Sequence, residues 1–325
     1  MSALSAVYGG VTRLRRSWYE RRPASRTRLP RPVISIGNLS VGGSGKTPIV
    51  AAVAHLLLAL GQRPAILSRG YRRRSSADLV VVSDGTGPRV PVEESGDEPQ
   101  MLARDLAGVP VVVSADRARA GRLAIERFGA SVLLLDDGYQ HVQLERTIDL
   151  LVLSAGDLGE RVLPSGRLRE PLSAARGAHA VLVYGSAQEA KDVAARVGVA
   201  RAFGVSTQFH PLRSVSAALP PESARVVAVA GIGRPERFFD ALRRQGHEVV
   251  REHTFPDHHW FTEADVQKVE QSSQESVVDC VVTTAKDAVR LEHLDHAMRL
   301  PWAILPITVT IDPSAEFESW LRRLL

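Results

Sequence analysis

The stretch Gly37-Asn38-Leu39-Ser40-Val41-Gly42-Gly43-Ser44-Gly45-Lys46-Thr47-Pro48 decides the fold of this 325-residue chain. Its end, Gly45-Lys46-Thr47, is typical of a phosphate-binding loop, in which backbone N–H groups cradle phosphates, the lysine reaches the β/γ oxygens and the threonine hydroxyl holds Mg²⁺. The usual pattern has a glycine five residues before Gly45, where this chain has Ser40. The flanks compensate, because a strand precedes the loop and a helix N-terminus follows it. We therefore predict a nucleotide-binding P-loop.

Apolar strands alternate with helical stretches on the C-terminal side of this loop. Such alternation predicts an α/β fold, with a P-loop NTPase-like parallel sheet flanked by helices. A hairpin is expected where Val80–Val82 and Val90–Val92 flank a turn at Asp84-Gly85. The other expected strands are Val33–Ile36, Ala65–Leu67, Val109–Val113, Val132–Leu135, Leu150–Leu153 and Ala180–Val183, and the expected helices are Pro48–Leu60, Glu98–Leu106 and Arg117–Phe128.

The alternation also divides the chain. Residues 204–221 break the rhythm and end in Pro220-Pro221, so we interpret them as a linker that can be two-stranded. A second α/β unit follows, with strands expected at Val226–Val229, Val277–Val282 and Trp302–Val309. The predicted parts are a basic amphipathic N-terminal arm (1–31), a P-loop domain (32–203), the linker (204–221) and a second, smaller α/β domain (222–325).

Composition excludes several classes of protein. Hydrophobic residues make up 44% and charged residues 24% of the chain, which is not the profile of a disordered or collagen-like protein. No stretch approaches the roughly 18–20 consecutive apolar residues of a membrane-spanning helix. The single cysteine, Cys280, excludes an internal disulfide and fits a reducing compartment.

The net charge of +5 is concentrated in the arm. Residues 1–31 carry eight arginines and one acid, so the arm has a charge of +7 and the remainder a charge of −2. Apolar residues in the arm recur at spacings of three and four, which places them on one helix face, with Arg13, Arg16 and Glu20 off that face. These apolar residues are Leu4, Val7, Tyr8, Val11, Leu14 and Trp18.

Two interpretations fit this arm. It can lie in a membrane interface, where each arginine near an anionic leaflet contributes about 1 kcal/mol. It can also be a docking helix that packs on its own domain, with Gly9 and Gly10 weakening the helix. Nucleic acid is not expected as a partner, because the aromatic residues lie among the apolar residues rather than among the arginines.

Two acidic motifs are candidates for chemistry. Asp136 and Asp137 end an apolar strand, where nucleoside triphosphatases place a Mg²⁺ contact, although a polar strand cap is the simpler reading of the pair alone. Asp97, in Gly96-Asp97-Glu98-Pro99, can be a carboxylate base for a hydroxyl nucleophile. Its local sequence favours a helix cap instead.

A histidine-rich turn, Phe255-Pro256-Asp257-His258-His259-Trp260-Phe261, is the remaining strong signal. A zinc site is disfavoured because the chain has one cysteine and no paired ligand spacing. A histidine that assists a proton transfer is the better functional interpretation, and a surface histidine pair is the alternative.

These motifs, in this order, resemble the tetraacyldisaccharide 4′-kinases, the lipid A 4′-kinases of Gram-negative bacteria. The run Asp136-Asp137-Gly138-Tyr139-Gln140-His141 is more specific than the phosphate loop. The other matching segments are Gly37–Pro48, Ser68–Tyr71, Gly96–Pro99, Leu163–Leu172, Gly231–Phe239, Asp257–His259 and Thr283–Asp287, so that the resemblance covers nearly the whole chain.

The resemblance implies a two-domain P-loop kinase, peripheral on the cytoplasmic face of the bacterial inner membrane. It would transfer the γ-phosphoryl of ATP, with Mg²⁺, to the 4′-hydroxyl of tetraacyldisaccharide 1-phosphate, giving lipid IVA. Asp97 would be the base, helped by a histidine, for which we favour His258 over His259. The expected cofactor-binding residues are Asn38, Gly42, Gly43, Ser44, Gly45, Lys46, Thr47, Arg69 and Gln140, and those expected on the metal side are Thr47, Asp136, Asp137 and Glu170.

Two other functions fit a P-loop protein with a basic arm. One is an NTPase switch that transfers the phosphoryl group to water. The other is a nucleotide-dependent membrane adaptor that binds nucleotide but barely turns over. Neither needs a carboxylate–histidine pair, which is the feature that favours the kinase.

Overall fold

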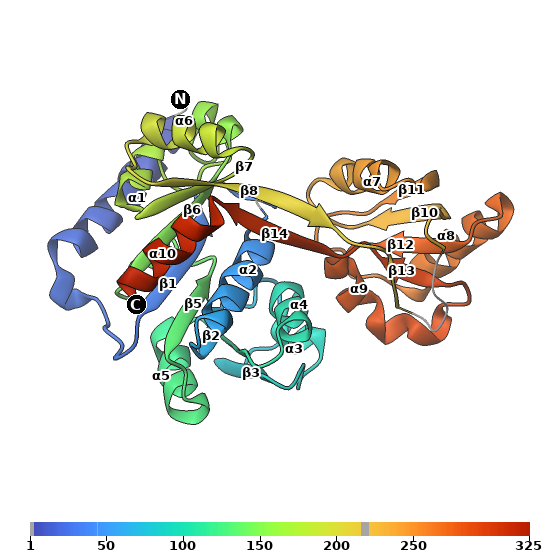
Figure 1. The fold of residues 1–325 in the computed structure, drawn as a ribbon, viewed down its shortest axis with the longest axis horizontal. Coiled ribbons are helices and arrows are strands. Elements are labelled where there is room, and N and C mark those ends of the chain that lie inside the picture. Colours follow the sequence, from blue (N-terminus) through green and yellow to red (C-terminus); the bar gives the residue numbers. More distant parts are fainter. Residues whose placement is uncertain (1–2, 44, 216–220) are drawn as a thin grey trace.

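The computed structural model describes residues 3–43, 45–215 and 221–325, which form two α/β units joined by two long strands (Figure 1). The larger sheet has the strand order β14-β8-β7-β6-β1-β5-β2-β4-β3. Neighbouring strands in it are parallel, except at the two edges, where β3 and β14 run antiparallel to their neighbours. Its strands are β1 (Val33–Asn38), β2 (Pro64–Ser68), β3 (Leu79–Asp84), β4 (Pro110–Ser114), β5 (Val132–Asp136), β6 (Ile148–Leu153), β7 (Ala180–Tyr184), β8 (Ala202–Phe209) and β14 (Ile307–Asp312).

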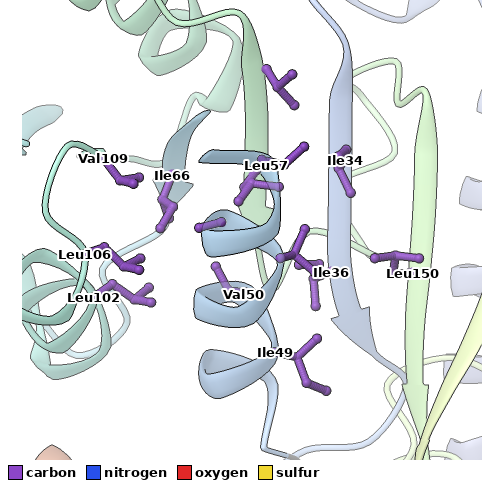
Figure 2. Packing of buried hydrophobic residues seen from close by; sticks show 14 of the residues in the cluster. Ile34, Ile36, Ile49, Val50, Leu57, Ile66, Leu102, Leu106, Val109 and Leu150 are labelled. Atoms are coloured by element: carbon purple, nitrogen blue, oxygen red, sulfur yellow. The ribbon is translucent and has the colours of Figure 1, made fainter. Parts of the chain in front are cut away.

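Helices cover both faces of the larger sheet, which confirms the predicted fold class. Ile34 and Ile36 of β1 face α2, whereas Leu133 and Leu135 of the neighbouring β5 point to the opposite face, toward α5. Figure 2 shows the first of these contacts, with Ile49 of α2 packed toward Ile36. One face carries α2 (Lys46–Ala59), α4 (Asp97–Asp105) and α10 (Ser314–Leu324), the other carries α5 (Arg117–Phe128) and α6 (Ala187–Val197), and shorter elements are α3 (Val92–Ser95), η1 (Pro23–Ser25), η2 (Ala155–Gly159) and η3 (Leu172–Gly177).

The smaller sheet has the order β11-β10-β12-β13-β9, with only β9 antiparallel to its neighbour. Phe238, Phe239 and Leu242 pack one helix on one face, and Val266 and Val269 pack another on the opposite face. The elements are β9 (Arg213–Ser214), β10 (Arg225–Ala230), α7 (Pro235–Arg244), β11 (Glu248–Thr254), α8 (Glu263–Ser276), β12 (Cys280–Thr283), α9 (Ala285–Leu291), η4 (Glu292–Ala297) and β13 (Trp302–Ile304).

The division of the chain differs from the expected one at two places. β8 continues the larger sheet to Phe209, into the predicted linker, and residues 216–220 lie outside the described residues. β14 pairs with β8 from Ile307 to Asp312, and Phe317 of α10 packs against Phe203. Residues 307–324, expected in the smaller domain, therefore lie on the larger sheet, and Figure 1 shows the red C-terminal helix there.

The predicted hairpin is reduced to an antiparallel bridge between Ser83 and Pro88 and a hydrogen bond of 2.8 Å from the Arg89 N–H to the Val82 carbonyl. β3 pairs antiparallel with β4, and Val92 begins the short helix α3 instead of a second strand. The physical reason is that a valine-rich run fits any free sheet edge, and β4 offers a longer partner than the run that follows the turn.

The arm forms helix α1 (Ala3–Arg21). Ser5, Gly9 and Arg16 are its buried residues, whereas Leu14 is 72% exposed. At about 100° per residue these two sets lie on opposite sides of the helix. The helix thus docks through its polar side and leaves its apolar side uncovered, with Leu4, Val7, Tyr8, Val11, Leu14 and Trp18 all exposed. None of the helices in the described part of the chain is long and apolar enough to cross a bilayer.

Candidate active site

The phosphate-binding loop connects β1 to α2, which begins at Lys46. Gly45 before it has a φ of 72°, and a Cβ there would lie 2.6 Å from the hydroxyl oxygen of Tyr184, so only glycine fits. The Tyr184 hydroxyl donates a hydrogen bond of 2.7 Å to the Gly45 carbonyl, which ties the loop to β7. Thr47 is buried in the first turn of α2, and Ser44 lies outside the described residues.

Lys46 lies in a cluster of polar side chains at the end of β1. Its Nζ is 3.1 Å from Asn38 Oδ1 and 3.4 Å from the Asp137 carboxylate. Arg169 donates two hydrogen bonds to Asp137, of 2.8 and 2.9 Å, and Gln140 Nε2 donates one of 2.9 Å to the Asn38 carbonyl. Burial opposes ionisation of Asp137, but Lys46 and Arg169 outweigh it and lower its pKa to about 2. Asp137 is therefore a permanent negative charge at this site.

Asp136 is buried beside this cluster and lacks a full set of partners. Ser68 Oγ donates to its Oδ2 at 3.1 Å, whereas its Oδ1 has no hydrogen-bond partner among the described residues. Burial, together with the negative charges of Glu98 and Asp137, raises the pKa of Asp136 to about 7. A buried carboxylate oxygen without a donor fits a cation.

The donor set fits magnesium better than a metal held by the protein alone. No group of three or more His, Cys, Asp or Glu side chains gathers into a metal site within the described residues. Mg²⁺ is usually held by one or two carboxylates together with substrate phosphates and waters. Asp136 and Asp137 supply two neighbouring carboxylates, and Thr47 lies in the first turn of the helix that follows the phosphate-binding loop.

Arg117 is a further candidate residue, close enough to Asp136 and Asp137 to interact with their charges, that the sequence analysis did not identify. It begins α5, after the carboxyl end of β4, and its buried guanidinium donates to the Ser114 carbonyl at 3.1 Å. Burial lowers its pKa to about 10, and the nearby charge of Arg69 acts in the same direction, against the opposing effect of Asp136. Arg69, whose side chain is exposed after β2, and Arg117 thus bring two positive charges to the rim of the carboxylate cluster.

The smaller domain supplies the second half of the site. His258 Nδ1 lies 2.8 Å from Oδ2 of Asp97, which is the first residue of α4 in the larger domain. The predicted cap role of Asp97 is wrong, because the glycine before it is the N-cap residue of α4 and no side chain of the described residues caps this helix. Asp97 Oδ1 instead accepts a hydrogen bond of 3.0 Å from the Glu98 backbone N–H. Burial alone would raise the pKa of Asp97, but the hydrogen bond with His258 and the charges of Lys286 and Arg290 hold it below the usual value.

The same domain also reaches the phosphate-binding loop. A Cβ at Gly233 would lie 3.6 Å from the Gly43 backbone nitrogen and 3.5 Å from the Asp257 carboxylate. The Asp257-His258 turn is therefore adjacent to the loop, and the Asp97–His258 pair lies between the two domains. His259 points elsewhere, because its Nε2 is 3.0 Å from Asp265 and its ring stacks on Phe255.

Glu170 differs most from its expected role. Both of its carboxylate oxygens accept hydrogen bonds from Arg16 of α1, at 2.6 and 2.9 Å, in a pair that is almost fully buried. Arg16 also donates to the Tyr139 carbonyl at 3.0 Å and stacks over the Tyr139 ring. The expected metal ligand is thus a partner of the arm, and this pair fastens α1 to the segments that carry Asp137 and Arg169.

We expect Arg16→Met to lower the free energy of unfolding by roughly 3–5 kcal/mol, because it leaves Glu170 buried without its partner. Urea denaturation followed by tryptophan fluorescence measures this loss. Arg13→Met is the matched control on the same helix, and because Arg13 is exposed it should change stability by no more than about 0.5 kcal/mol. Equal effects of the two substitutions would contradict the anchoring role of Arg16.

The arrangement suits the transfer of a phosphoryl group to a hydroxyl. It combines a phosphate-binding loop, two neighbouring carboxyl groups, positive charges at the rim and an ionised carboxylate held by a histidine. These supply positioning, charge neutralisation and a proton acceptor. Of the expected residues, the structure brings together Asn38, Lys46, Asp136, Asp137 and Gln140 on one side and Asp97 and His258 on the other.

Comparison with known proteins agrees with this chemistry. The sequence model of the family described as "LpxK: Tetraacyldisaccharide-1-P 4'-kinase" matches residues 1–325. The tetraacyldisaccharide 4′-kinase of Koribacter versatilis is 40% identical over 313 residues, which cover 94% of this chain and 92% of its own. That of Syntrophus aciditrophicus is 37% identical over 339 residues, with coverages of 98% and 90%.

A solved structure shares the whole fold. The crystal structure of LpxK from Aquifex aeolicus in complex with ATP, at 2.2 Å resolution, matches with a TM-score of 0.79 and 32% sequence identity. The match covers 99% of this chain and 97% of the Aquifex chain. Sequence and structure therefore agree that this chain is a kinase and belongs to the tetraacyldisaccharide 4′-kinase family.

Proposed function

We propose that this enzyme transfers the γ-phosphoryl group of ATP to the 4′-hydroxyl of tetraacyldisaccharide 1-phosphate, giving lipid IVA, with Asp97 as the base. The observation that carries the base assignment is the 2.8 Å contact between Asp97 and His258, next to the phosphate-binding loop. An NTPase switch or a nucleotide-dependent adaptor has no use for a carboxylate–histidine pair. The names of the relatives support the acceptor.

In the proposed reaction the 4′ oxygen forms a bond to the γ-phosphorus while the bond from that phosphorus to the β–γ bridging oxygen breaks, and ADP leaves. Asp97 accepts the proton of the 4′-hydroxyl, because its depressed pKa keeps it ionised and ready to do so. Lys46 and the loop N–H groups hold the transferring phosphoryl, and Arg117 and Arg69 add positive charge.

Asp136, Asp137 and the Thr47 hydroxyl would hold Mg²⁺, which, when bound, neutralises phosphate charge and fixes the phosphate geometry. The orphaned Asp136 Oδ1 supports this assignment. Asn38 and Gln140 act indirectly in this proposal. Asn38 Oδ1 accepts a hydrogen bond from Lys46, and the side-chain amide of Gln140 donates one to the Asn38 carbonyl.

We further propose that the enzyme works at the cytoplasmic face of the inner membrane, held there by α1. A substrate with four acyl chains stays in the bilayer, so the site has to approach the membrane surface. The uncovered apolar side of α1 and the excess of arginines in the arm support this location. The Arg16–Glu170 pair would then join the membrane-bound helix to the active site.

Phosphoryl transfer from γ-labelled ATP to the disaccharide monophosphate in mixed micelles tests the proposed function. We expect label in the lipid and little ATP consumption when the acceptor is absent. ATP consumption that is equal with and without the acceptor, with no labelled lipid, would instead support the NTPase switch. Nucleotide binding without turnover in either condition would support the adaptor.

Leu14→Gln is expected to weaken binding to vesicles of anionic lipid by about 10–100-fold, because burying a leucine side chain contributes roughly 1.5–3 kcal/mol. Sedimentation with sucrose-loaded vesicles measures this loss. Ala6→Gln is the matched control, since residue 6 is exposed on α1 but lies off the apolar side. The membrane role of this side would be refuted if both variants sedimented with the vesicles as well as the wild type does.

A further inference from the structure

The peptide group between Asp257 and His258 is held from both domains. Its N–H, which belongs to His258, donates a hydrogen bond of 3.1 Å to the Gly231 carbonyl within the smaller domain. Its carbonyl, which belongs to Asp257, accepts a hydrogen bond of 2.8 Å from Arg72 Nη1 of the larger domain. The orientation of this peptide group therefore depends on Arg72, a residue to which the proposed reaction assigns no role.

The orientation of the peptide group determines where the imidazole of His258 points. His258 has a φ of 62°, in the left-handed region that residues with a Cβ adopt only rarely and at a cost in free energy. This angle is the rotation between the peptide group and the Cα that carries the imidazole. With it, His258 Nδ1 lies 2.8 Å from Asp97 Oδ2 and Nε2 lies 3.1 Å from Lys286 Nζ. A strained conformation of this kind persists only where surrounding contacts hold it.

Arg72 reaches this peptide group from a loop that is fixed beside the proposed base. The loop follows β2, and its backbone packs against Gly96, the residue before the base, where a Cβ would lie 3.0 Å from the Tyr71 carbonyl oxygen. The Arg74 backbone N–H also donates a hydrogen bond of 2.7 Å to the Glu93 carbonyl. The loop thus links the place of the carboxylate in the larger domain to the histidine turn of the smaller domain.

The two neighbours of Arg72 contact the same turn in a different way. The ring of Tyr71 meets the His258 ring edge-on, with centroids 5.4 Å apart, and the Arg74 guanidinium lies 4.3 Å from the centroid of the Trp260 ring. Both of these are contacts with side-chain rings, whereas Arg72 contacts the backbone. Arg72 is therefore the neighbour that can fix the φ of His258.

We propose that Arg72 is a positioning residue for the phosphoryl transfer: its guanidinium fixes the peptide group before His258, and thereby the imidazole that holds Asp97 in place. Without this hydrogen bond the peptide group can rotate, and the φ of His258 can return to the region that residues with a Cβ prefer. The imidazole then no longer faces Asp97, so the base is present but less often in place. This inference rests on the proposed role of the Asp97–His258 pair.

The first test is the single-turnover transfer of labelled phosphate from ATP to the disaccharide monophosphate in mixed micelles. We expect Arg72→Met to lower the rate about tenfold, because hydrogen bonds from a charged donor are among the stronger ones. Arg72→Gly also lacks the guanidinium, and glycine suits the φ of 58° at this position, so it should lose as much as Arg72→Met. A wild-type rate in Arg72→Gly would overturn the proposal, because the loss in Arg72→Met would then come from the backbone of residue 72.

A double-mutant cycle with His258→Ala tests whether Arg72 acts through the histidine. If it does, Arg72→Met should change the rate by no more than about twofold in a protein that already carries His258→Ala. A full tenfold loss in that background would overturn the proposal. It would mean that Arg72 contacts a substrate phosphate directly or serves only to hold the two domains together.

Arg74→Met is the matched control for charge and for contact with the turn. It removes one arginine from the same loop and the ring contact with Trp260, and it leaves the peptide group before His258 bound. We expect its rate to stay within about threefold of wild type, and a loss as large as that of Arg72→Met would overturn the proposal. Failure of the proposed function is distinguishable, because the wild type would then label no lipid, or His258→Ala alone would transfer phosphate at the wild-type rate.

Discussion

Asp97→Asn is expected to lower kcat by about 10²–10⁴-fold, the range that a positioned general base contributes. Asparagine has the same shape as aspartate, and its single oxygen can still accept from the Glu98 N–H, whereas its NH2 group replaces the oxygen that faces His258 Nδ1. The helix start is therefore retained and the basic carboxylate is lost. A sugar hydroxyl is a poor nucleophile at neutral pH, which is why the proton acceptor has such a large effect. Single-turnover transfer of labelled phosphate to the lipid measures this loss.

The affinity for ATP should stay within about threefold of wild type in this variant, because Asp97 contacts neither the phosphate-binding loop nor Lys46 in the proposed mechanism. Asp105→Asn provides the same substitution at the other end of the same helix, and we expect it to keep full turnover. Near-normal kcat in Asp97→Asn would refute the base assignment.

Asp97→Asn should also change how the stability of the protein depends on pH. The pKa of Asp97 is lowered in the folded protein, so its ionised form stabilises the fold above the pKa of the unfolded chain, and this contribution is lost as the pH falls through the folded-state pKa. The Tm of Asp97→Asn should therefore be lower than that of the wild type at pH 7. The difference should shrink toward acidic pH.

Local patterns were sufficient to predict the centre of the larger domain. The helix Arg117–Phe128 has the predicted bounds, and the strand ahead of the phosphate-binding loop extends the predicted run by two residues. Apolar runs bounded by turn residues carry this information locally. The errors concern pairing at the sheet edges, because β3 and β14 join strands that are chosen by the whole fold and by no nearby residue.

The candidate site shows the same division between local and distant information. Lys46, Asp136 and Asp137 are recognisable because each follows a buried strand or begins a helix. The Arg16–Glu170 pair joins residues 154 positions apart, so no spacing in the sequence indicates it. Lys286 was visible only as part of the Thr283–Asp287 turn, and its contact with His258 depends on the closure of two domains.

Lys46→Met is expected to lower kcat/KM by about 10²–10³-fold, the cost of removing one preorganised donor from a transition state that gains negative charge. The side chain of Lys46 is only 12% exposed, and it adjoins Asn38 and Asp137 at the mouth of the phosphate-binding loop. Removing its charge also takes away one of the groups that hold the pKa of Asp137 near 2. Steady-state kinetics with varied ATP, with Lys191→Met on the exposed side of α6 as control, measures the loss.

Lys46→Arg should fail to rescue this loss, although it restores the charge. Arg169 already supplies a planar guanidinium to Asp137 and Asn38, so a second one has no free carboxylate to bind in the same geometry. A compact ammonium reaches a phosphate oxygen as a point charge, which a broader guanidinium cannot do in the space beside Asn38. The chain has 37 arginines and only four lysines. The need for a compact ammonium group explains why position 46 is one of these four lysines. Full turnover in Lys46→Arg would mean that position 46 needs only a positive charge, and that the loop geometry does not select lysine.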